Sequence, residues 1–224
     1  MFHEIKNRIL SSLNLSVRTD EVLPCKRVVM PLQHSAHTYI PSALFLRELV
    51  RNPKSIGAVC CSSERLGNRM ARHIELHEDG LVVELGGGTG AITNALLLHG
   101  LAASKLIVIE KSQILATHLS IRFPNIRVIH GDAADMELIV HGALPVKTIV
   151  SGLPLRSLPK KQVVGITNAC VKTLHPKGRL IQFTYAPGAS SPWLSTGLER
   201  IKSERVWNNI PPARIDVFIP AHIR

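Results

Sequence analysis

The chain has 224 residues, of which 45% are hydrophobic, so it can bury one substantial core and is expected to form one domain with an appendage. No run reaches the roughly 18 apolar residues of a membrane-spanning helix, the N-terminus lacks the apolar core of a signal peptide, and the four cysteines form no CxxC pair. The net charge of +11 lies at the two ends, because residues 1–75 carry +5, residues 76–150 carry −2 and residues 151–224 carry +8. Such a charge attracts polyanions, either nucleic acid or the anionic face of a bilayer.

The first part of the chain is less regular than the rest. Residues 43–51 predict an amphipathic helix in which apolar residues accompany Arg47 and Arg51, and such a helix either lies in a bilayer interface or packs on the core. Asn52-Pro53 ends it, because the residue before a proline disfavours helix. Residues 62–76 predict a second helix. The expected domains are an N-terminal extension at 1–40, amphipathic membrane-facing or lid helices at 41–79, and a ligand-binding domain at 80–224.

From residue 80, apolar strands alternate with helices. Strands followed by helices in this order predict an α/β fold, a Rossmann-like, mostly parallel seven-stranded sheet with helices on both faces. A closing antiparallel pair is predicted from residues 205–209 and 213–220. The other predicted strands are 81–86, 105–110, 126–132, 146–152 and 178–185, and the predicted helices are 91–100, 112–123 and 160–174.

The strongest motif joins the first of these strands to the following helix. In "VVELGGGTGAIT", residues 82–93, a buried strand runs into four glycines, whose backbone freedom lets a ligand approach the main chain. A phosphate-binding P-loop would need a Lys that is missing, whereas a dinucleotide fingerprint stays open with Ala91 in place of its last glycine. The alternative pattern, E-x-G-x-G-x-G, resembles motif I of class I S-adenosylmethionine-dependent methyltransferases. The resemblance assigns the cofactor's amino group to Glu84, and its sugar and amino-acid parts to Gly86, Gly88, Thr89 and Gly90.

Two acidic residues follow the next two predicted strands. Glu110 ends the second strand, where an acid suits the hydroxyl groups of a ribose in either a nicotinamide or an S-adenosylmethionine site. Asp132-Ala133 ends the third strand, where class I methyltransferases often place an acid on the adenine amine. Three acids at consecutive strand ends, together with the glycine loop, favour S-adenosylmethionine over a dinucleotide or a degenerate site. No metal is expected.

The fourth strand ends in the corner "SGLPL", residues 151–155. Enzymes that methylate the exocyclic amine of adenine resemble one another in an Asn/Asp-Pro-Pro-Tyr motif here, and the ribosomal RNA adenine dimethylases carry a related Asn-Leu-Pro-Tyr. This chain keeps the Leu-Pro, but Gly152 stands in place of the Asn and Leu155 in place of the aromatic residue. Stacking on a base is worth roughly 1–3 kcal/mol, so its loss counts against a nucleobase acceptor.

The corner, followed by "RSLP", resembles the bacterial phospholipid N-methyltransferase family. Three further segments are similar to it: "FLRELVRNPKSIGAVCCSSERLGNRM" before the core, the glycine loop, and "IQFTYAP" at the fifth strand. The resemblance covers roughly residues 40–220. Cys61 and Gly87 depart from it, since the family usually has Pro at both places. Residues 1–40 have no counterpart in it, which leaves room for a changed lipid acceptor.

The resemblance implies methylation of an amine headgroup, most simply phosphatidylethanolamine to phosphatidylcholine, with an ornithine lipid or an RNA adenine as alternative acceptors. A binding module without activity is a further alternative, against which the intact donor motif argues. The implied partners are a phospholipid substrate and an anionic membrane surface, with the protein in the cytoplasm, peripheral on the inner face of the cytoplasmic membrane. The expected catalytic residues are Tyr185, Ser151 and Gly152, and the expected substrate-binding residues are Leu153, Pro154, Leu155, Arg156 and Tyr39.

Overall fold

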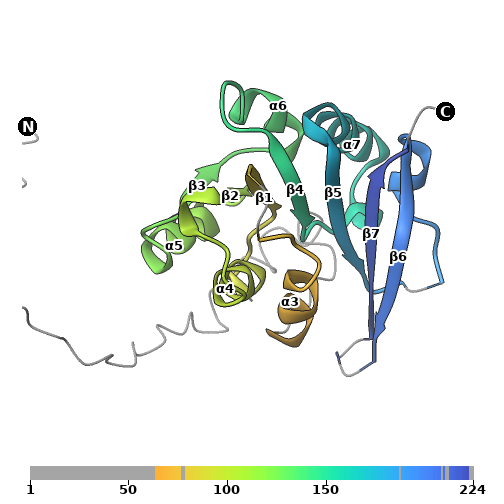
Figure 1. Ribbon diagram of the computed structural model, residues 1–224, viewed down its shortest axis with the longest axis horizontal. Helices are drawn as coiled ribbons and strands as arrows, with labels where there is room; N and C mark the ends of the chain where they lie inside the picture. The colour runs from red at the N-terminus through yellow and green to blue at the C-terminus, as the bar shows by residue number, and fades with distance from the viewer. Residues whose placement is uncertain (1–63, 77–78, 187, 208, 210–211, 222–224) are drawn as a thin grey trace, which may run out of the picture. The chain divides into compact units, whose positions relative to one another are not determined.

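The computed structural model describes residues 64–76, 79–186, 188–207, 209 and 212–221 (Figure 1). The predicted extension at 1–40, the predicted helix at 43–51 and Tyr39 lie outside these residues, so the predicted domain boundaries stay predictions. Within the part of the chain that is described, no helix is both long and apolar enough to cross a bilayer.

The described strands form one sheet. They are β1 (Leu81–Leu85), β2 (Leu106–Glu110), β3 (Arg127–His130), β4 (Val146–Ser151), β5 (Leu174–Thr184), β6 (Leu198–Val206) and β7 (Ala213–Pro220). Their order is β3-β2-β1-β4-β5-β7-β6, in which the first five strands are parallel and β7 pairs antiparallel with both neighbours. The predicted mostly parallel seven-stranded sheet is confirmed. Because the chain leaves β1 toward β2 on one side and returns as β4 on the other, the switch point where ligands of such sheets bind lies at the ends of these strands.

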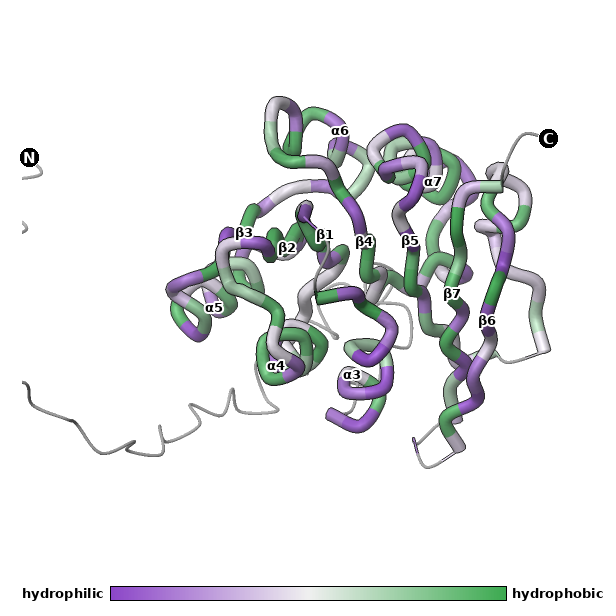
Figure 2. The backbone as a smooth tube through the Cα atoms, viewed as in Figure 1, coloured by the Kyte–Doolittle hydropathy of each residue, from purple (hydrophilic) through white to green (hydrophobic). Residues whose placement is uncertain are grey.

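Helices cover both faces of the sheet (Figure 1). Leu66, Leu96 and Leu119 from the first three helices pack in the core on one face, and Met136, Cys170 and Trp193 from the later segments pack in the core on the other. The strands in the middle of the sheet are mostly hydrophobic, whereas α3 is mostly hydrophilic on its outer side (Figure 2). The helices are α3 (Glu64–Ala71), α4 (Ala91–Leu98), α5 (Gln113–Arg122), α6 (Met136–Ile139) and α7 (Lys160–Thr173), with 3-10 turns η1 (Ala103–Lys105), η2 (Ala133–Asp135), η3 (Leu155–Ser157) and η4 (Pro192–Ser195).

The structure differs from the sequence prediction mainly near the C-terminus. Strand β6 begins at Leu198, seven residues before the predicted segment at 205–209. The sequence prediction missed this start because most side chains of β6 are charged and exposed at the sheet edge, so the strand has no apolar alternation. The turn η4 was not predicted, although its Trp193 is fully buried. Helix α3 ends at Ala71, within the predicted segment 62–76.

Candidate active site

Backbone hydrogen bonds hold the carboxyl ends of four strands together. The Gly86 amide donates to Ile109 O over 2.8 Å, the Gly152 amide donates to Leu85 O over 2.8 Å, and the Gly131 amide donates to Glu110 O over 3.0 Å. The loops that follow β1, β2, β3 and β4 therefore start from fixed positions at one edge of the sheet, and a ligand lying on this edge meets all of them.

The loop after β1 needs glycine at its different positions for different reasons. Gly86 has φ +75°, and a Cβ there would lie 2.8 Å from Cδ2 of Leu153 in the corner. Gly90 has φ +84°, and a Cβ there would lie 2.6 Å from the ring of Phe123. Gly88 has φ +54° but no atom within 4 Å of a Cβ, so this side of the loop faces open space. The Thr89 carbonyl accepts a hydrogen bond from Arg122 over 2.7 Å, which anchors the loop to α5.

A pocket of about 130 Å³, which we call the β2–β3 pocket, opens beside this loop. Glu110 stands at its wall and is 7% exposed. Its Oε2 accepts the Gly88 amide over 2.9 Å and its Oε1 accepts the Ser112 amide over 2.8 Å, so the carboxylate links the loop after β1 to the start of α5. A carboxylate oxygen can accept a second hydrogen bond, which leaves both oxygens able to take hydroxyl groups of a ligand. The predicted cofactor residues that line this pocket are Gly86, Gly88, Glu110, Asp132 and Ala133.

Asp132 lines the same pocket. Its Oδ1 accepts the Ala134 amide over 3.0 Å as the cap of η2, and its Oδ2 accepts from Lys111 over 2.8 Å. Partial burial opposes its ionisation, but the Ala134 amide and Lys111 outweigh burial and hold the pKa of this carboxyl below its usual value. Asp132 is therefore ionised at neutral pH and is a ready acceptor for an amine.

Glu84 lies on β1, two residues before the first glycine of the loop. It lines neither the β2–β3 pocket nor the second pocket described below. It is fully buried, and its Oε2 accepts the Thr93 hydroxyl of α4 over 2.7 Å, while Oε1 has no hydrogen-bond partner among the described residues. Burial raises the pKa of this carboxyl to about 8, with the charge of Glu110 acting in the same direction. A buried oxygen without a partner is costly, so the position suits a ligand that brings a donor.

A second pocket of about 270 Å³, the β5–β7 pocket, lies on the other side of the corner. Gly152, Leu153 and Pro154 line both pockets, so the corner is the wall between them. A Cβ at Gly152 would lie 2.8 Å from the carbonyl oxygen of Gly86. The glycine is therefore required by the close approach of the corner to the loop after β1, and an Asn cannot stand there unless the backbone moves.

The other predicted acceptor residues are distributed unequally around the β5–β7 pocket. Tyr185, Leu155 and Arg156 line it, and the Tyr185 ring packs edge-on against Phe183 with 5.3 Å between ring centroids. Ser151 is fully buried, and its Oγ accepts the Leu153 amide over 3.4 Å; it lines neither of the two pockets described here.

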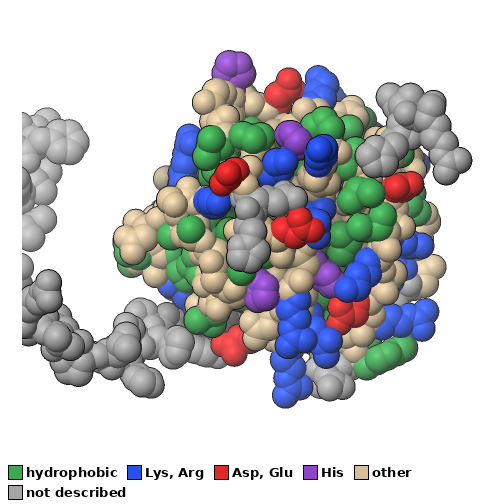
Figure 3. All heavy atoms as spheres, viewed as in Figure 1, with side chains coloured by type: hydrophobic (Ala, Val, Ile, Leu, Met, Phe, Trp, Pro, Cys, Tyr) green, Lys and Arg blue, Asp and Glu red, His purple; other side chains and the backbone are tan. Residues whose placement is uncertain are grey.

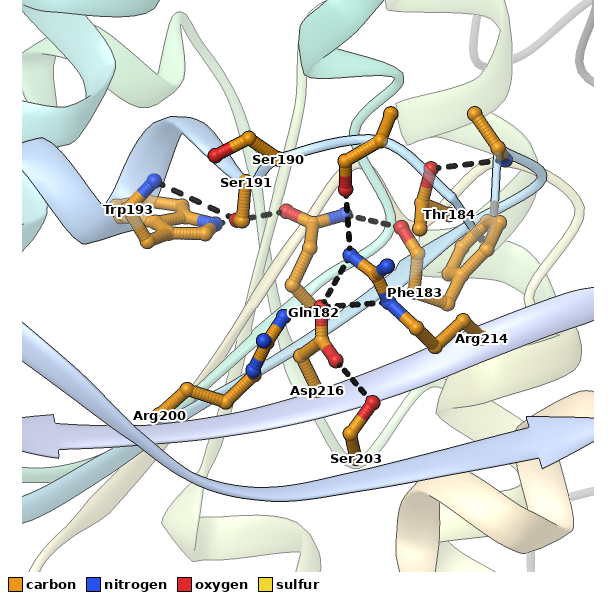
Figure 4. A network of polar contacts seen from close by, with 12 residues as sticks. Gln182, Phe183, Thr184, Ser190, Ser191, Trp193, Arg200, Ser203, Arg214 and Asp216 are labelled. Atoms are coloured by element: carbon orange, nitrogen blue, oxygen red, sulfur yellow. Dashed lines mark hydrogen bonds and ion pairs between the residues drawn. The ribbon is translucent and has the colours of Figure 1, made fainter.

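The structure adds three polar residues that the sequence analysis did not single out. Gln182 of β5 donates to the carbonyls of Ser151 and Leu153 over 3.3 and 3.1 Å and accepts from Trp193 over 3.2 Å. These hydrogen bonds hold the corner to β5 and η4. Arg214 and Asp216 of β7 form an ion pair with 2.8 Å between Nη2 and Oδ2. Figure 4 shows the three side chains gathered beneath the loop that carries Ser190 and Ser191.

A signal for these residues exists in the sequence, but it is indirect. "ARIDVFIP" places Arg214 and Asp216 two residues apart, and therefore on one face of a strand, among apolar neighbours. A buried polar pair on a strand indicates a site or a network. That this pair lies opposite Gln182 depends on the register of β5 with β7, which pairs Gln182 with Asp216.

No protein-family model matches the chain, but known proteins to which it is similar are methyltransferases. An ornithine lipid N-methyltransferase from Singulisphaera acidiphila is 29% identical over 175 residues, which make up 76% of this chain and 91% of that protein. A ribosomal RNA small subunit methyltransferase A from Thermotoga maritima is 31% identical over 103 residues, 45% of this chain and 36% of that protein. The solved N-methyltransferase NodS from Bradyrhizobium japonicum, in complex with S-adenosyl-L-homocysteine, aligns with a TM-score of 0.56 at 18% identity and covers 79% of this chain and 96% of that one.

The chain has the class I methyltransferase fold. The predicted fold class is confirmed by this likeness and by the sheet order with its antiparallel β7. The predicted cofactor, S-adenosylmethionine, agrees with the NodS complex, because S-adenosyl-L-homocysteine is what S-adenosylmethionine becomes once its methyl group has been transferred. The RNA methyltransferase matches over less than half of this chain, whereas the lipid methyltransferase matches over three quarters of it.

Proposed function

We propose that this protein transfers a methyl group from S-adenosylmethionine to the amine of a membrane lipid headgroup. The observation that carries the proposal is the Gly152–Pro154 corner, which separates two pockets and presents a glycine and apolar side chains to both. A corner of this composition offers a nucleobase neither a polar partner nor a stacking ring, but it leaves space for a small amine. The relative from Singulisphaera acidiphila, an ornithine lipid N-methyltransferase, supports the same class of acceptor.

In this proposal, the β2–β3 pocket holds the cofactor. Both oxygens of Glu110 can accept the ribose hydroxyls, because each already has one backbone N–H in place and keeps a second acceptor position. Ionised Asp132 faces the adenine amine. The open side of Gly88 leaves room for the amino-acid part, whose ammonium group would reach the unpartnered, buried Oε1 of Glu84 after a shift of the glycine loop. S-adenosylmethionine, when bound, supplies a methyl group on a positively charged sulfur that a neutral amine can attack.

The β5–β7 pocket holds the acceptor. Leu153, Pro154 and Leu155 exclude water next to the amine, and an apolar surrounding favours the neutral form of an amine, which is the form that reacts. The edge-on contact with Phe183 fixes the Tyr185 ring, and an aromatic ring attracts a methylated ammonium. Positioning the amine in line with the methyl group supplies much of the acceleration, which is why the corner needs no acid or base of its own.

An ornithine lipid is the acceptor that the comparisons favour within this class, ahead of phosphatidylethanolamine. The curated ornithine lipid enzyme and this chain share 175 aligned residues, whereas methylation to phosphatidylcholine rests on the sequence resemblance alone. Both lipids have a primary amine, so the apolar corner fits either. They differ in the anionic group that accompanies the amine, a carboxylate in one and a phosphodiester in the other.

The test is to incubate the purified full-length protein with methyl-labelled S-adenosylmethionine and, separately, vesicles with ornithine lipid, vesicles with phosphatidylethanolamine, and small-subunit ribosomal RNA. We expect label in the lipid extract, most in ornithine lipid, and none in RNA. The variant Gly86→Val serves as the inactive control. Label in RNA and in neither lipid contradicts the proposal.

A further inference from the structure

The β5–β7 pocket has an excess of positive charge, although the buried carboxylate of Asp216 also lines it. Arg156, Arg214 and Asp216 are the charged residues among those described that line it. Asp216 is 1% exposed; its Oδ1 accepts the Ser203 hydroxyl over 2.8 Å, and its Oδ2 lies 2.8 Å from Arg214 and 3.7 Å from Arg200. Its negative charge is thus shared between two guanidinium groups, and the pocket as a whole presents positive charge.

The two arginines come from different elements and donate to the same short segment. Arg214 comes from β7 and donates from Nη2 to the Ala189 carbonyl over 3.0 Å, while Arg156 comes from η3 and donates to the Ser190 carbonyl over 3.2 Å. These carbonyls belong to consecutive residues of one segment, both arginines line the same pocket, and both of these acceptors are neutral oxygens.

The side chains around these arginines suit an anion. A guanidinium has five N–H donors, so the recorded bond to Ser190 O leaves Arg156 further donors. Asp216 fixes the plane of Arg214 through contacts to both Nε and Nη2. The hydroxyl oxygens of Thr184 and Ser191 each accept a backbone N–H, which leaves their own hydrogens to donate. A guanidinium fork held in a fixed plane can bind a planar carboxylate through two parallel hydrogen bonds.

We propose that Arg156 and Arg214 bind the carboxylate of the acceptor headgroup and so select amine lipids that carry one, an inference that rests on the proposed function. The amine then lies at the opposite side of the pocket, against the Gly152–Pro154 corner. Ornithine with one amine acylated has this combination of one amine and one carboxylate. The arginines have a second effect, since nearby positive charge lowers the pKa of the substrate ammonium and favours the neutral nucleophile. Asp216 acts as a positioning residue for Arg214.

The experiment compares ornithine lipid with the analogue in which a hydrogen atom replaces the carboxylate, an acylated 1,4-diaminobutane that keeps the amine and the acyl chains but has no anion. Both are presented in the same mixed micelles to the full-length wild type and to Arg156→Gln, and kcat/KM is measured for each. We expect the wild type to prefer the acid by about tenfold or more, as for loss of a charge-assisted hydrogen bond. In Arg156→Gln this preference falls toward one. Lys160→Gln, an exposed neighbour that lines neither pocket, keeps the wild-type preference.

Arg214→Lys is the second variant, because it keeps the charge beside Asp216 while the planar fork is lost; we expect it to reduce the preference for the acid as well. Calorimetric titration with S-adenosylmethionine shows that each variant is folded. The inference is overturned if the wild type methylates the acid and the analogue without a carboxylate equally, or if Arg156→Gln lowers both rates by one factor. Preferred methylation of phosphatidylethanolamine overturns the carboxylate assignment in favour of a phosphodiester. Methylation of no lipid overturns the proposed function together with this inference.

Discussion

The two pockets on either side of the Gly152–Pro154 corner are built in different ways. The β2–β3 pocket uses backbone amides, glycines and carboxyls that end consecutive strands, so most of its polar atoms come from short segments of sequence. The β5–β7 pocket uses long side chains from β5, β7 and η3, whose meeting depends on strand register. This difference explains how one fold keeps a constant donor site while its acceptor site changes, and it separates substitutions that affect the cofactor from those that affect the lipid.

The largest expected effect is on the donor side, from Gly86→Val. A valine at φ +75° is strained, and its Cβ would meet Leu153 at 2.8 Å, so the loop and the corner have to move apart. We expect loss of S-adenosylmethionine binding by calorimetry. Gly142→Val is the matched control, because Gly142 has φ +72° but nothing within 4 Å of a Cβ. Equal loss of binding in the control would assign the effect to backbone strain alone.

A charge reversal in the predicted amphipathic helix should separate the lipid side from the donor side. Arg47 and Arg51 changed together to Glu should weaken sedimentation with anionic vesicles by roughly 30-fold, since each basic residue contributes about 1 kcal/mol near an anionic surface. The affinity for S-adenosylmethionine should not change. Arg127→Glu together with Lys177→Glu, two exposed reversals elsewhere on the surface, controls for the same change in net charge. Basic side chains also gather over α3 and beside the adjoining end of β6 (Figure 3), so vesicle binding that is unchanged in the double variant would move the docking surface there.

A smaller effect is expected from Glu110→Gln, which keeps the shape of the side chain. One of the two backbone N–H groups that Glu110 accepts then faces an amide NH2, which cannot accept, and the other hydrogen bond loses its charge assistance. Cofactor affinity should therefore fall about tenfold or more, and the preference for the lipid with a carboxylate should stay. Calorimetry and the two-substrate assay give these quantities separately. Asp135→Asn, an exposed change in the neighbouring turn η2, is the control. A changed lipid preference in Glu110→Gln would mean that the two pockets are not independent.

The last prediction concerns stability and not the binding of a ligand: Glu84 should make the free energy of unfolding depend on pH. Its pKa is raised by burial to about 8 in the folded protein, from 4.5, so between these values the folded state keeps a proton that the unfolded state releases. The free energy of unfolding should therefore fall as pH rises from about 4.5 to about 8, by at most about 1.4 kcal/mol for each unit. Urea denaturation at several pH values should show this slope in the wild type, and a shallower one in Glu84→Gln. The exposed control Glu137→Gln should keep the slope; a wild-type slope in Glu84→Gln would contradict the assignment.

The donor side could be predicted from sequence because its elements are local. Glu84 to Gly90 span seven residues, and Glu110 and Asp132 follow apolar strands whose pattern is clear. On the acceptor side, the predicted Ser151 is buried under the corner, while Gln182, Arg214 and Asp216 were missed. Their contact depends on β7 entering the sheet between β5 and β6, which no local pattern indicates. Gly152 shows the same limit: its absent side chain was interpreted as a lost base contact, and the structure adds the close approach to Gly86 O as its physical cause.

The most direct measurement places both candidate acceptors in competition. One reaction contains the full-length protein, limiting S-adenosylmethionine, vesicles with ornithine lipid, and small-subunit ribosomal RNA, and mass spectrometry locates the transferred methyl group. The apolar corner predicts that the methyl group is found on the lipid amine and that Gly86→Val abolishes the transfer. Methylated adenine with unmodified lipid would contradict the account.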